Sequence, residues 1–121
     1  MYTELDAEAW LRNNNVRFFR TGSRVICTPP VMDTDADIVV YDPTGALSLR
    51  NWTEATTDSD YDGGVRTFRL GEVNLIVVDE EDDFKRWQVA TQIASRMNLK
   101  SKPERIALFQ GVLYDNWSMW G

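Results

Sequence analysis

The sequence predicts one α+β domain over residues 1–121, with a mixed β-sheet flanked by helices and a helical C-terminus. Three features of the chain lead to this prediction. A helix-capping pattern opens it, short runs of β-branched and aromatic residues alternate with turn residues, and two stretches of helical spacing close it. The length is near the commonest domain size, and 43% hydrophobic residues are enough for one core.

The first predicted element is a helix that Thr3 caps, with Asp6 three residues later in a capping-box position. Three asparagines at positions 13–15 end this helix, and residues 16–20 form a strand that runs into a Gly-Ser turn. The apolar stripe that is expected to pack inward from the helix consists of Leu5, Ala9 and Trp10.

The middle of the chain is predicted to contain one buried strand between irregular segments. Residues 25–27 form an extended segment or a short helix, and prolines at 29 and 30 then force irregular backbone. Residues 37–41, an unbroken apolar run after Asp37, are typical of a buried strand. Residues 46–52 are predicted as a short helix, and the polar residues 53–64 as a loop or a flap.

The last part of the chain predicts a β-hairpin and two helices. Residues 65–70 and 73–78 form the two strands, with Gly71 in the turn between them. A long helix follows over about residues 80–98, and Pro103 starts a final helix. The inward positions of the long helix are expected to be Phe84, Trp87, Ala90, Thr91 and Ala94, with Met97 one turn on.

The composition excludes several classes of function. A net charge of −6 disfavours non-specific binding to nucleic acid and to anionic membranes, since both require clustered Lys and Arg. The chain has no apolar run of membrane-spanning length, no basic and apolar leader at its start, and only one cysteine, Cys27. We therefore expect a cytoplasmic protein without membrane contact. The absence of histidine excludes Ser-His-Asp triads and histidine-ligated zinc.

The stretch that carries the functional prediction is Thr21-Gly22-Ser23-Arg24 together with Asp35 and Asp37. Residues two apart on a strand point to the same face, so the two aspartates can converge on one divalent cation. The small Gly-Ser turn lets backbone and hydroxyl donors approach a phosphate closely. These are the parts that phosphoryl or nucleotidyl transfer requires, although a solvated acidic turn would present the same aspartates.

This pattern resembles the first motif of the minimal nucleotidyltransferases of the DNA polymerase β superfamily. That motif is an apolar residue, Gly-Ser or Gly-Gly, a gap, and then Asp-apolar-Asp-apolar; here only Thr21 departs from it, being polar. The chain also resembles small nucleotidyltransferase-like proteins of tailed bacteriophages in the phrases at residues 20–24, 74–78 and 105–109. The resemblance implies a nucleotidyltransferase-like fold, Mg²⁺ at Asp35 and Asp37, and a nucleoside triphosphate held by Gly22, Ser23 and Arg24.

Asn74 is the departure with the greatest consequence. Active members of that superfamily have a third carboxylate on a later strand, and the matching phrase here is Val73-Asn74-Leu75. An Asn oxygen can still coordinate a metal ion, but a neutral amide cannot accept the proton of an attacking hydroxyl. Glu72 lies about one strand repeat, roughly 7 Å, away, too far to substitute without rearrangement. Asp33 could mimic a ligand, but its spacing fits less well.

Three functions remain open on this reading. The first is a nucleotidyltransferase, active through Asp35 and Asp37, that transfers a nucleotidyl group to an acceptor which the sequence does not identify. The second is an inactive protein of the same fold, in host cytoplasm if phage-encoded, that binds and modulates a host protein. The third is a structural subunit that binds neither nucleotide nor metal. The aromatic residues 117 and 120 near the C-terminus raise a homodimer as a further expectation.

Overall fold

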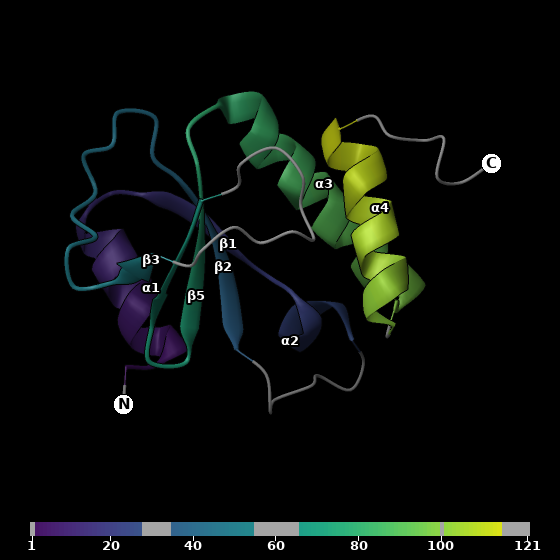
Figure 1. Cartoon of the computed structure of the whole chain (residues 1–121), viewed down its shortest axis with the longest axis horizontal. Helices are drawn as coiled ribbons and strands as arrows, with labels where there is room; N and C mark the ends of the chain where they lie inside the picture. Colours follow the sequence, from purple (N-terminus) through teal and green to yellow (C-terminus); the bar gives the residue numbers. More distant parts are fainter. Residues whose placement is uncertain (1, 28–34, 55–65, 100, 115–121) are drawn as a thin grey trace.

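A computed structural model describes residues 2–27, 35–54, 66–99 and 101–114, apart from the side chains of Ser23, Lys102 and Tyr114. These residues form an α+β fold, as predicted, with a five-stranded mixed sheet and a helical C-terminal part (Figure 1). The elements in chain order are α1 (Glu4–Asn13), β1 (Arg17–Thr21), α2 (Ser23–Ile26), β2 (Ala36–Tyr41), β3 (Thr53–Glu54), β4 (Arg66–Leu70), β5 (Val73–Val78), α3 (Glu81–Met97) and α4 (Lys102–Tyr114).

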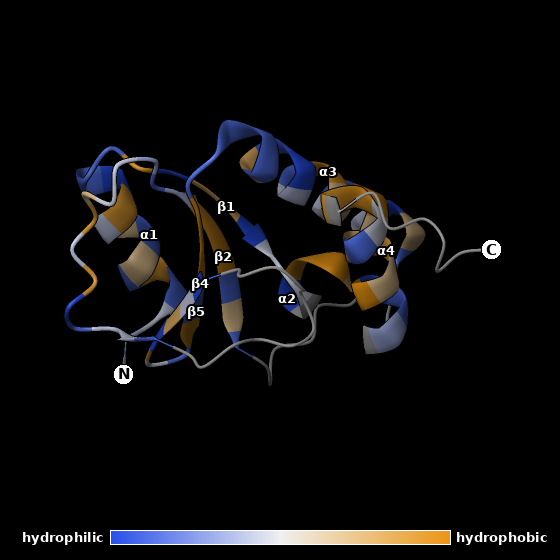
Figure 2. Cartoon of the chain, turned by 45° about the horizontal axis from the view of Figure 1, so that its top comes forward, coloured by the Kyte–Doolittle hydropathy of each residue, from blue (hydrophilic) through white to orange (hydrophobic). Residues whose placement is uncertain are grey.

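The sheet has the strand order β1-β2-β5-β4-β3. Its inner strands β2 and β5 run parallel, whereas β1 pairs antiparallel with β2, β4 with β5 and β3 with β4. Val, Ile and Leu dominate β2 and β5, and Figure 2 shows these strands largely in the hydrophobic colour. Such apolar runs are expected where helices cover both faces of a strand, so the predicted buried strand and hairpin are confirmed within the described residues.

Two hydrophobic cores lie on opposite faces of the sheet. On one face α2, α3 and α4 pack against Val39, Ile76 and Val78. On the other face α1 and the segment between β2 and β3 pack against Ile38, Val40 and Leu75. Side chains alternate between the faces along each strand, so residues 37 and 39 of β2, and 74 and 76 of β5, share the face with α3.

The first helix has the predicted cap but turns a different side toward the sheet. Thr3 and Asp6 form the capping box, with the Asp6 amide donating to Thr3 Oγ1 at 3.3 Å. The predicted stripe is wrong for two of its residues, since Leu5 is 70% exposed and Ala9 is also exposed. The residues that α1 buries are Ala7, Glu8 and Leu11. The helix is short and poor in large apolar residues, so contacts with the sheet and the ion pair of Glu8 decide which side faces inward.

The predicted helix at residues 46–52 is wrong. Asp42 accepts hydrogen bonds from the amides of Ala46 and Leu47, at 3.2 and 3.4 Å, and thereby folds this segment into turns. Leu47 and Trp52 both reach the core beside α1. In a helix these two residues would lie on different sides, because they are five positions apart in the sequence. Residues 53 and 54, predicted as part of a loop, form β3, and the rest of that loop lies outside the described residues.

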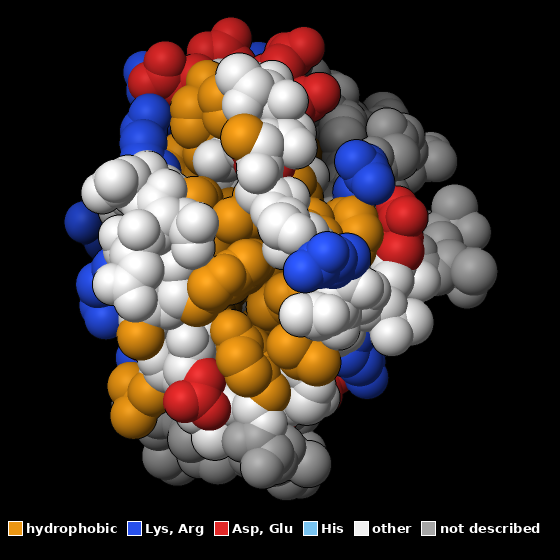
Figure 3. Space-filling model, turned by 90° about the vertical axis from the view of Figure 1, so that its left-hand side faces the viewer, with side chains coloured by type: hydrophobic (Ala, Val, Ile, Leu, Met, Phe, Trp, Pro, Cys, Tyr) orange, Lys and Arg blue, Asp and Glu red, His pale blue; other side chains and the backbone are white. Residues whose placement is uncertain are grey.

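Helix α1 covers only part of its face of the sheet. Trp10 stacks on Trp52 with ring centroids 5.6 Å apart, and both Trp10 and Leu49 stay partly accessible. Figure 3, which shows the side of the molecule where α1 and β3 lie, has apolar side chains across the middle of the surface.

The two C-terminal helices confirm their predicted positions within a residue or so. Asn98, with φ of 52°, ends α3 in a left-handed conformation. The predicted inward residues of α3 are buried, but Met97 is 57% exposed, so its assignment to the core is wrong. Cys27 is buried. The expectations for residues 117 and 120 fall outside the described residues. Within the described part of the chain, no helix has the length and apolarity to cross a membrane.

Candidate functional site

A row of side chains crosses the sheet at the end of β1 and the starts of β2 and β5. In the register of the sheet, Thr21 lies opposite Asp37, Asp37 beside Asn74, and Asn74 opposite Arg69. Neighbours across strands point to the same face, which here is the face that α3 covers. The predicted aspartate and the predicted third position are therefore immediate neighbours.

Asp37 is the centre of this row. Its Oδ1 accepts a hydrogen bond from Asn74 Nδ2 at 3.2 Å. Burial raises the pKa of the Asp37 carboxyl to about 6, and the carboxylate of Asp35 acts in the same direction. The hydrogen bond from Asn74 and the charges of Arg69 and Arg24 lower that pKa without offsetting the effect of burial. The ionised carboxylate is thus only partly compensated by the side chains around it.

Gly22 packs directly against this carboxylate. Its φ is +79°, in the left-handed region that favours glycine, and a Cβ atom at this position would overlap Asp37 Oδ2. Its carbonyl oxygen accepts from the amides of Val25 and Ile26, at 3.1 and 2.9 Å, and so starts α2. The predicted Gly-Ser turn and the predicted aspartate are therefore in contact, and only glycine fits between them.

Asp35 lies just before β2 and is bound by an arginine from β4. Arg69 Nη2 is 2.7 Å from Asp35 Oδ2, and the two side chains are 56% and 39% exposed. The charge of Asp35 raises the pKa of Asp37, after burial as the larger cause. The pairing of Asp35 with Arg69 was not expected from the sequence.

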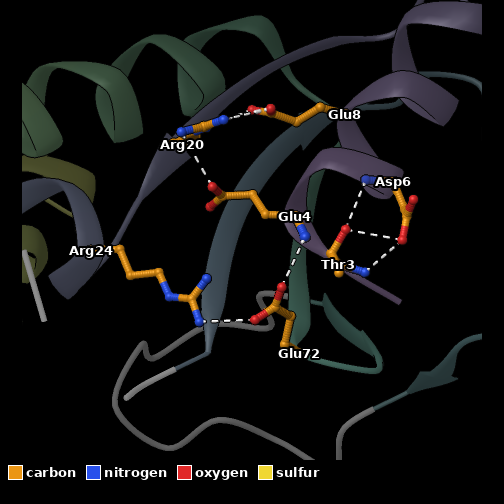
Figure 4. A network of polar contacts seen from close by, with 7 residues as sticks. All are labelled: Thr3, Glu4, Asp6, Glu8, Arg20, Arg24 and Glu72. Carbon is orange, nitrogen blue, oxygen red and sulfur yellow. Dashed lines mark hydrogen bonds and ion pairs between the residues drawn. The ribbon is translucent and has the colours of Figure 1, made fainter. Parts of the chain in front are cut away.

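Arg24 and Glu72 form a second ion pair beside this row. Arg24 Nη2 is 3.1 Å from Glu72 Oε2, and the Arg24 side chain is only 11% exposed. Glu72 also accepts the Glu4 amide at 3.2 Å, and Figure 4 shows its carboxylate between α1 and Arg24. These bonds lower the pKa of Glu72, the hydrogen bond from Arg24 being the larger cause. Glu72 therefore holds Arg24 and does not stand in for the missing third carboxylate.

Thr21 is polar where the first motif has an apolar residue, and its hydroxyl bonds to α3. Its side chain is 3% exposed, and its Oγ1 lies 2.7 Å from Thr91 Oγ1 on α3. Thr91 donates its own proton to the Trp87 carbonyl at 2.8 Å, so Thr21 is the donor in the bond between the two hydroxyls. The hydroxyl at position 21 ties the end of β1 to α3, where the usual apolar residue would only pack.

The side chains of this row, together with Asp35 just before β2, offer oxygen ligands that suit a hard divalent cation. Carboxylate oxygens of Asp35 and Asp37 and the amide oxygen of Asn74 are the oxygen ligands that Mg²⁺ prefers. Among the described residues, no three His, Cys, Asp or Glu side chains are grouped as metal ligands. Asp33 and the side chain of Ser23 lie outside the described residues.

A surface groove of about 330 Å³ lies elsewhere, between β1, α2 and α3. None of the aspartates or Asn74 lines it. The residues around it are Phe19, Arg20, Val25, Gln88, Thr91, Gln92, Ser95 and Arg96. It is therefore not the space beside the carboxylates, although it adjoins the row at Thr91, which bonds Thr21.

Comparisons with protein-family models, with curated proteins and with solved structures found no match to this chain.

Proposed function

We propose that the protein binds a nucleoside triphosphate together with Mg²⁺ at Asp35, Asp37 and Asn74, next to the Gly22 turn. The observation that carries the proposal is the contact of Gly22 with the Asp37 carboxylate, directly beside Asn74 on the parallel strand. A glycine turn, the Asp37 carboxylate and the Asn74 amide thus lie together at one end of the sheet, with Asp35 two residues before Asp37. The resemblance to the nucleotidyltransferases supports the same proposal through the same residues.

The uncompensated charge of Asp37 supports a cation at this place. A carboxylate whose pKa is about 6 through burial gains more from a bound cation than an exposed carboxylate does. Bound Mg²⁺ would supply charge neutralisation to a triphosphate, as it does in nucleotidyl transfer. Of the chain's own residues, Asp35 and Asp37 would hold the cation, Gly22 lets the Asp37 carboxylate lie directly against the turn, and Arg24 contributes positive charge nearby.

We expect the transfer of a nucleotidyl group to an acceptor hydroxyl to be slow. Asn74 cannot take a proton from that hydroxyl, and Asp37, which accepts a hydrogen bond from Asn74, is the remaining base within the row. We therefore propose binding of Mg²⁺ and nucleotide with slow nucleotidyl transfer. Both ligands are cytoplasmic, so the proposal places the protein in the cytoplasm, or in the host cytoplasm if a bacteriophage encodes it.

Titration calorimetry with each nucleoside triphosphate in the presence of Mg²⁺ tests the binding. Asp37→Asn keeps the acceptor oxygen for Asn74 but removes the charge, so we expect affinity to fall at least tenfold. Asp82→Asn removes the same charge from an exposed position at the start of α3 and is the matched control. Equal affinities for the two variants and the native protein, or no binding by the native protein, would refute the proposed site.

Asn74 also favours a second candidate, a protein of the same scaffold that binds another protein and has no transfer activity. Asn74→Asp restores a carboxylate beside Asp37 and separates the two candidates. Incorporation of an α-³²P label into an acceptor by the variant alone would show that the native protein is catalytically disabled. Incorporation by the native protein would exclude the binding-only candidate.

A further inference from the structure

Arg69 occupies the carboxylate that the proposed cation needs. Its guanidinium reaches Asp35 Oδ2 at 2.7 Å from β4, where it lies opposite Asn74 in the sheet register. We propose that Arg69 is an internal counter-ion that competes with Mg²⁺ for Asp35, and that its release couples cation binding to phosphate binding. The inference rests on the proposed function for the identity of its ligands.

The charges of the row explain why such a counter-ion matters. Asp35 and Asp37 carry two negative charges when both are ionised, and Asn74 adds none. Arg69 offsets one of these charges, so an approaching cation meets a net charge of about −1 in place of the −3 that a third carboxylate without an arginine would give. Cation binding in the absence of nucleotide is therefore weak while the arginine stays in place.

The exposure of the pair makes Arg69 displaceable. With 56% of its side chain exposed, Arg69 forms the kind of surface ion pair that contributes little to stability. Arg24 differs, because its side chain is only 11% exposed and its partner Glu72 is also bonded to α1. Of the two arginines near Asp37, Arg69 is thus the one that can leave its carboxylate at little cost.

A displaced Arg69 remains beside the same end of the sheet, and its guanidinium can then bind a phosphate through two parallel hydrogen bonds. A bound phosphate holds Arg69 away from Asp35 and so frees this carboxylate for the cation. A cation bound to Asp35 in turn frees Arg69 for the phosphate, so each ligand increases the affinity for the other. By linkage, the factor by which Mg²⁺ increases nucleotide affinity equals the factor by which nucleotide increases Mg²⁺ affinity.

Titration of the native protein and Arg69→Gln with Mg²⁺ alone tests the competition. The backbone amide NMR signals of Asp37 and Asn74 report binding at the site. We expect Arg69→Gln to bind Mg²⁺ about five- to tenfold more tightly, from the loss of one nearby positive charge and of an exposed ion pair. The matched control is Arg66→Gln, on the same strand, which removes a somewhat more exposed pair with Glu54 at 3.2 Å. It should change the affinity less than twofold.

The partner of Arg69 is tested by a double variant. If Arg69 acts mainly through Asp35, Arg69→Gln should have a much smaller effect in a protein that already carries Asp35→Asn, where only the influence of its charge on Asp37 remains. An unchanged Mg²⁺ affinity in Arg69→Gln, an equal effect of Arg66→Gln, or no Mg²⁺ binding by any of the proteins would each overturn the competition.

Nucleotide titrations with and without Mg²⁺ then test the coupling. The native protein should show a larger increase in nucleotide affinity on addition of Mg²⁺ than Arg69→Gln does, and equal increases would overturn the coupling. The two proposals fail separately. Tighter Mg²⁺ binding by Arg69→Gln without nucleotide binding by the native protein refutes the proposed function but keeps the competition. Nucleotide binding that depends on Asp37, with unchanged Mg²⁺ affinity in Arg69→Gln, keeps the function and refutes the competition.

Discussion

The contact of Gly22 with Asp37 predicts a large loss of stability in Gly22→Ala. Alanine at a φ of +79° costs about 1 kcal/mol in backbone strain. Its Cβ would also overlap Asp37 Oδ2, so the carboxylate has to move away from the Asn74 amide. Losing a hydrogen bond to a charged group costs about 2 kcal/mol. We therefore expect Gly22→Ala to reduce the free energy of unfolding by about 3 kcal/mol.

Gly45→Ala is the matched control, because the chain offers a second left-handed glycine in open surroundings. Gly45 has a φ of +68°, and a Cβ there would meet no atom within 4 Å. It should therefore show only the backbone strain of about 1 kcal/mol. The difference between the two variants measures the overlap with Asp37.

Urea denaturation followed by tryptophan fluorescence measures both effects. With a slope of about 1.5 kcal/mol per molar urea, Gly22→Ala should lower the midpoint by about 2 M and Gly45→Ala by less than about 1 M. In a protein that carries Asp37→Ala, most of the excess cost of Gly22→Ala should disappear. Unfolding free energies within 0.5 kcal/mol of each other for the two glycine variants would refute the packing of Gly22 on Asp37.

Three further predictions concern titration and buried polar pairs. The pKa of Asp37 is raised in the folded state to about 6, so the folded protein binds more protons than the unfolded chain between about pH 4 and 6, and stability falls as the pH rises through this window. Asp37→Asn should remove this loss, so its free energy of unfolding in urea at pH 7 should exceed that of the native protein by an amount on the order of 2 kcal/mol. An identical pH dependence of stability for the two proteins would contradict this prediction. Glu8 is 3% exposed and binds Arg20 on β1 through two bonds of 2.6 and 2.7 Å, so Glu8→Gln should cost about 2 kcal/mol, whereas Glu81→Gln, in an exposed pair, should leave the stability nearly unchanged. Thr91→Val should cost about 1 to 2 kcal/mol because it leaves the Thr21 hydroxyl without an acceptor, whereas Thr21→Val leaves Thr91 bonded to the Trp87 carbonyl and should cost less; thermal unfolding of both variants would reveal the order.

The sequence predicts well where its signals act over a few residues. The cap at Thr3 and Asp6 is such a signal, because the two side chains bond to backbone groups within one helical turn. The apolar runs of β2 and β5 likewise identify strands that helices cover on both faces. The prediction of a helix at 46–52 was wrong because its helical preference is weak. The hydrogen bonds that the Asp42 side chain accepts and the burial of Leu47 and Trp52 outweigh that preference.

The candidate site was predictable in its carboxylates but not in its arginines. Alternation along a strand predicts that Asp35 and Asp37 share a face, and the resemblance to a known motif pointed to Asn74, which lies beside Asp37 in the sheet. The pairing of Arg69 with Asp35 depends on β4 lying beside β5 in one particular register. A pattern along the chain does not contain that register, so the competition between arginine and cation could not be anticipated.

The capping box at Thr3, the buried strands and the glycine turn follow from spacing over a few residues, so the sequence alone predicts them. The contacts of Asn74 with Asp37, of Glu72 with Arg24 and of Arg69 with Asp35 emerge only in the folded chain. Each of these contacts joins residues more than thirty positions apart. Their geometry follows from how the strands are ordered and aligned in the sheet, which is fixed when both hydrophobic cores form around it.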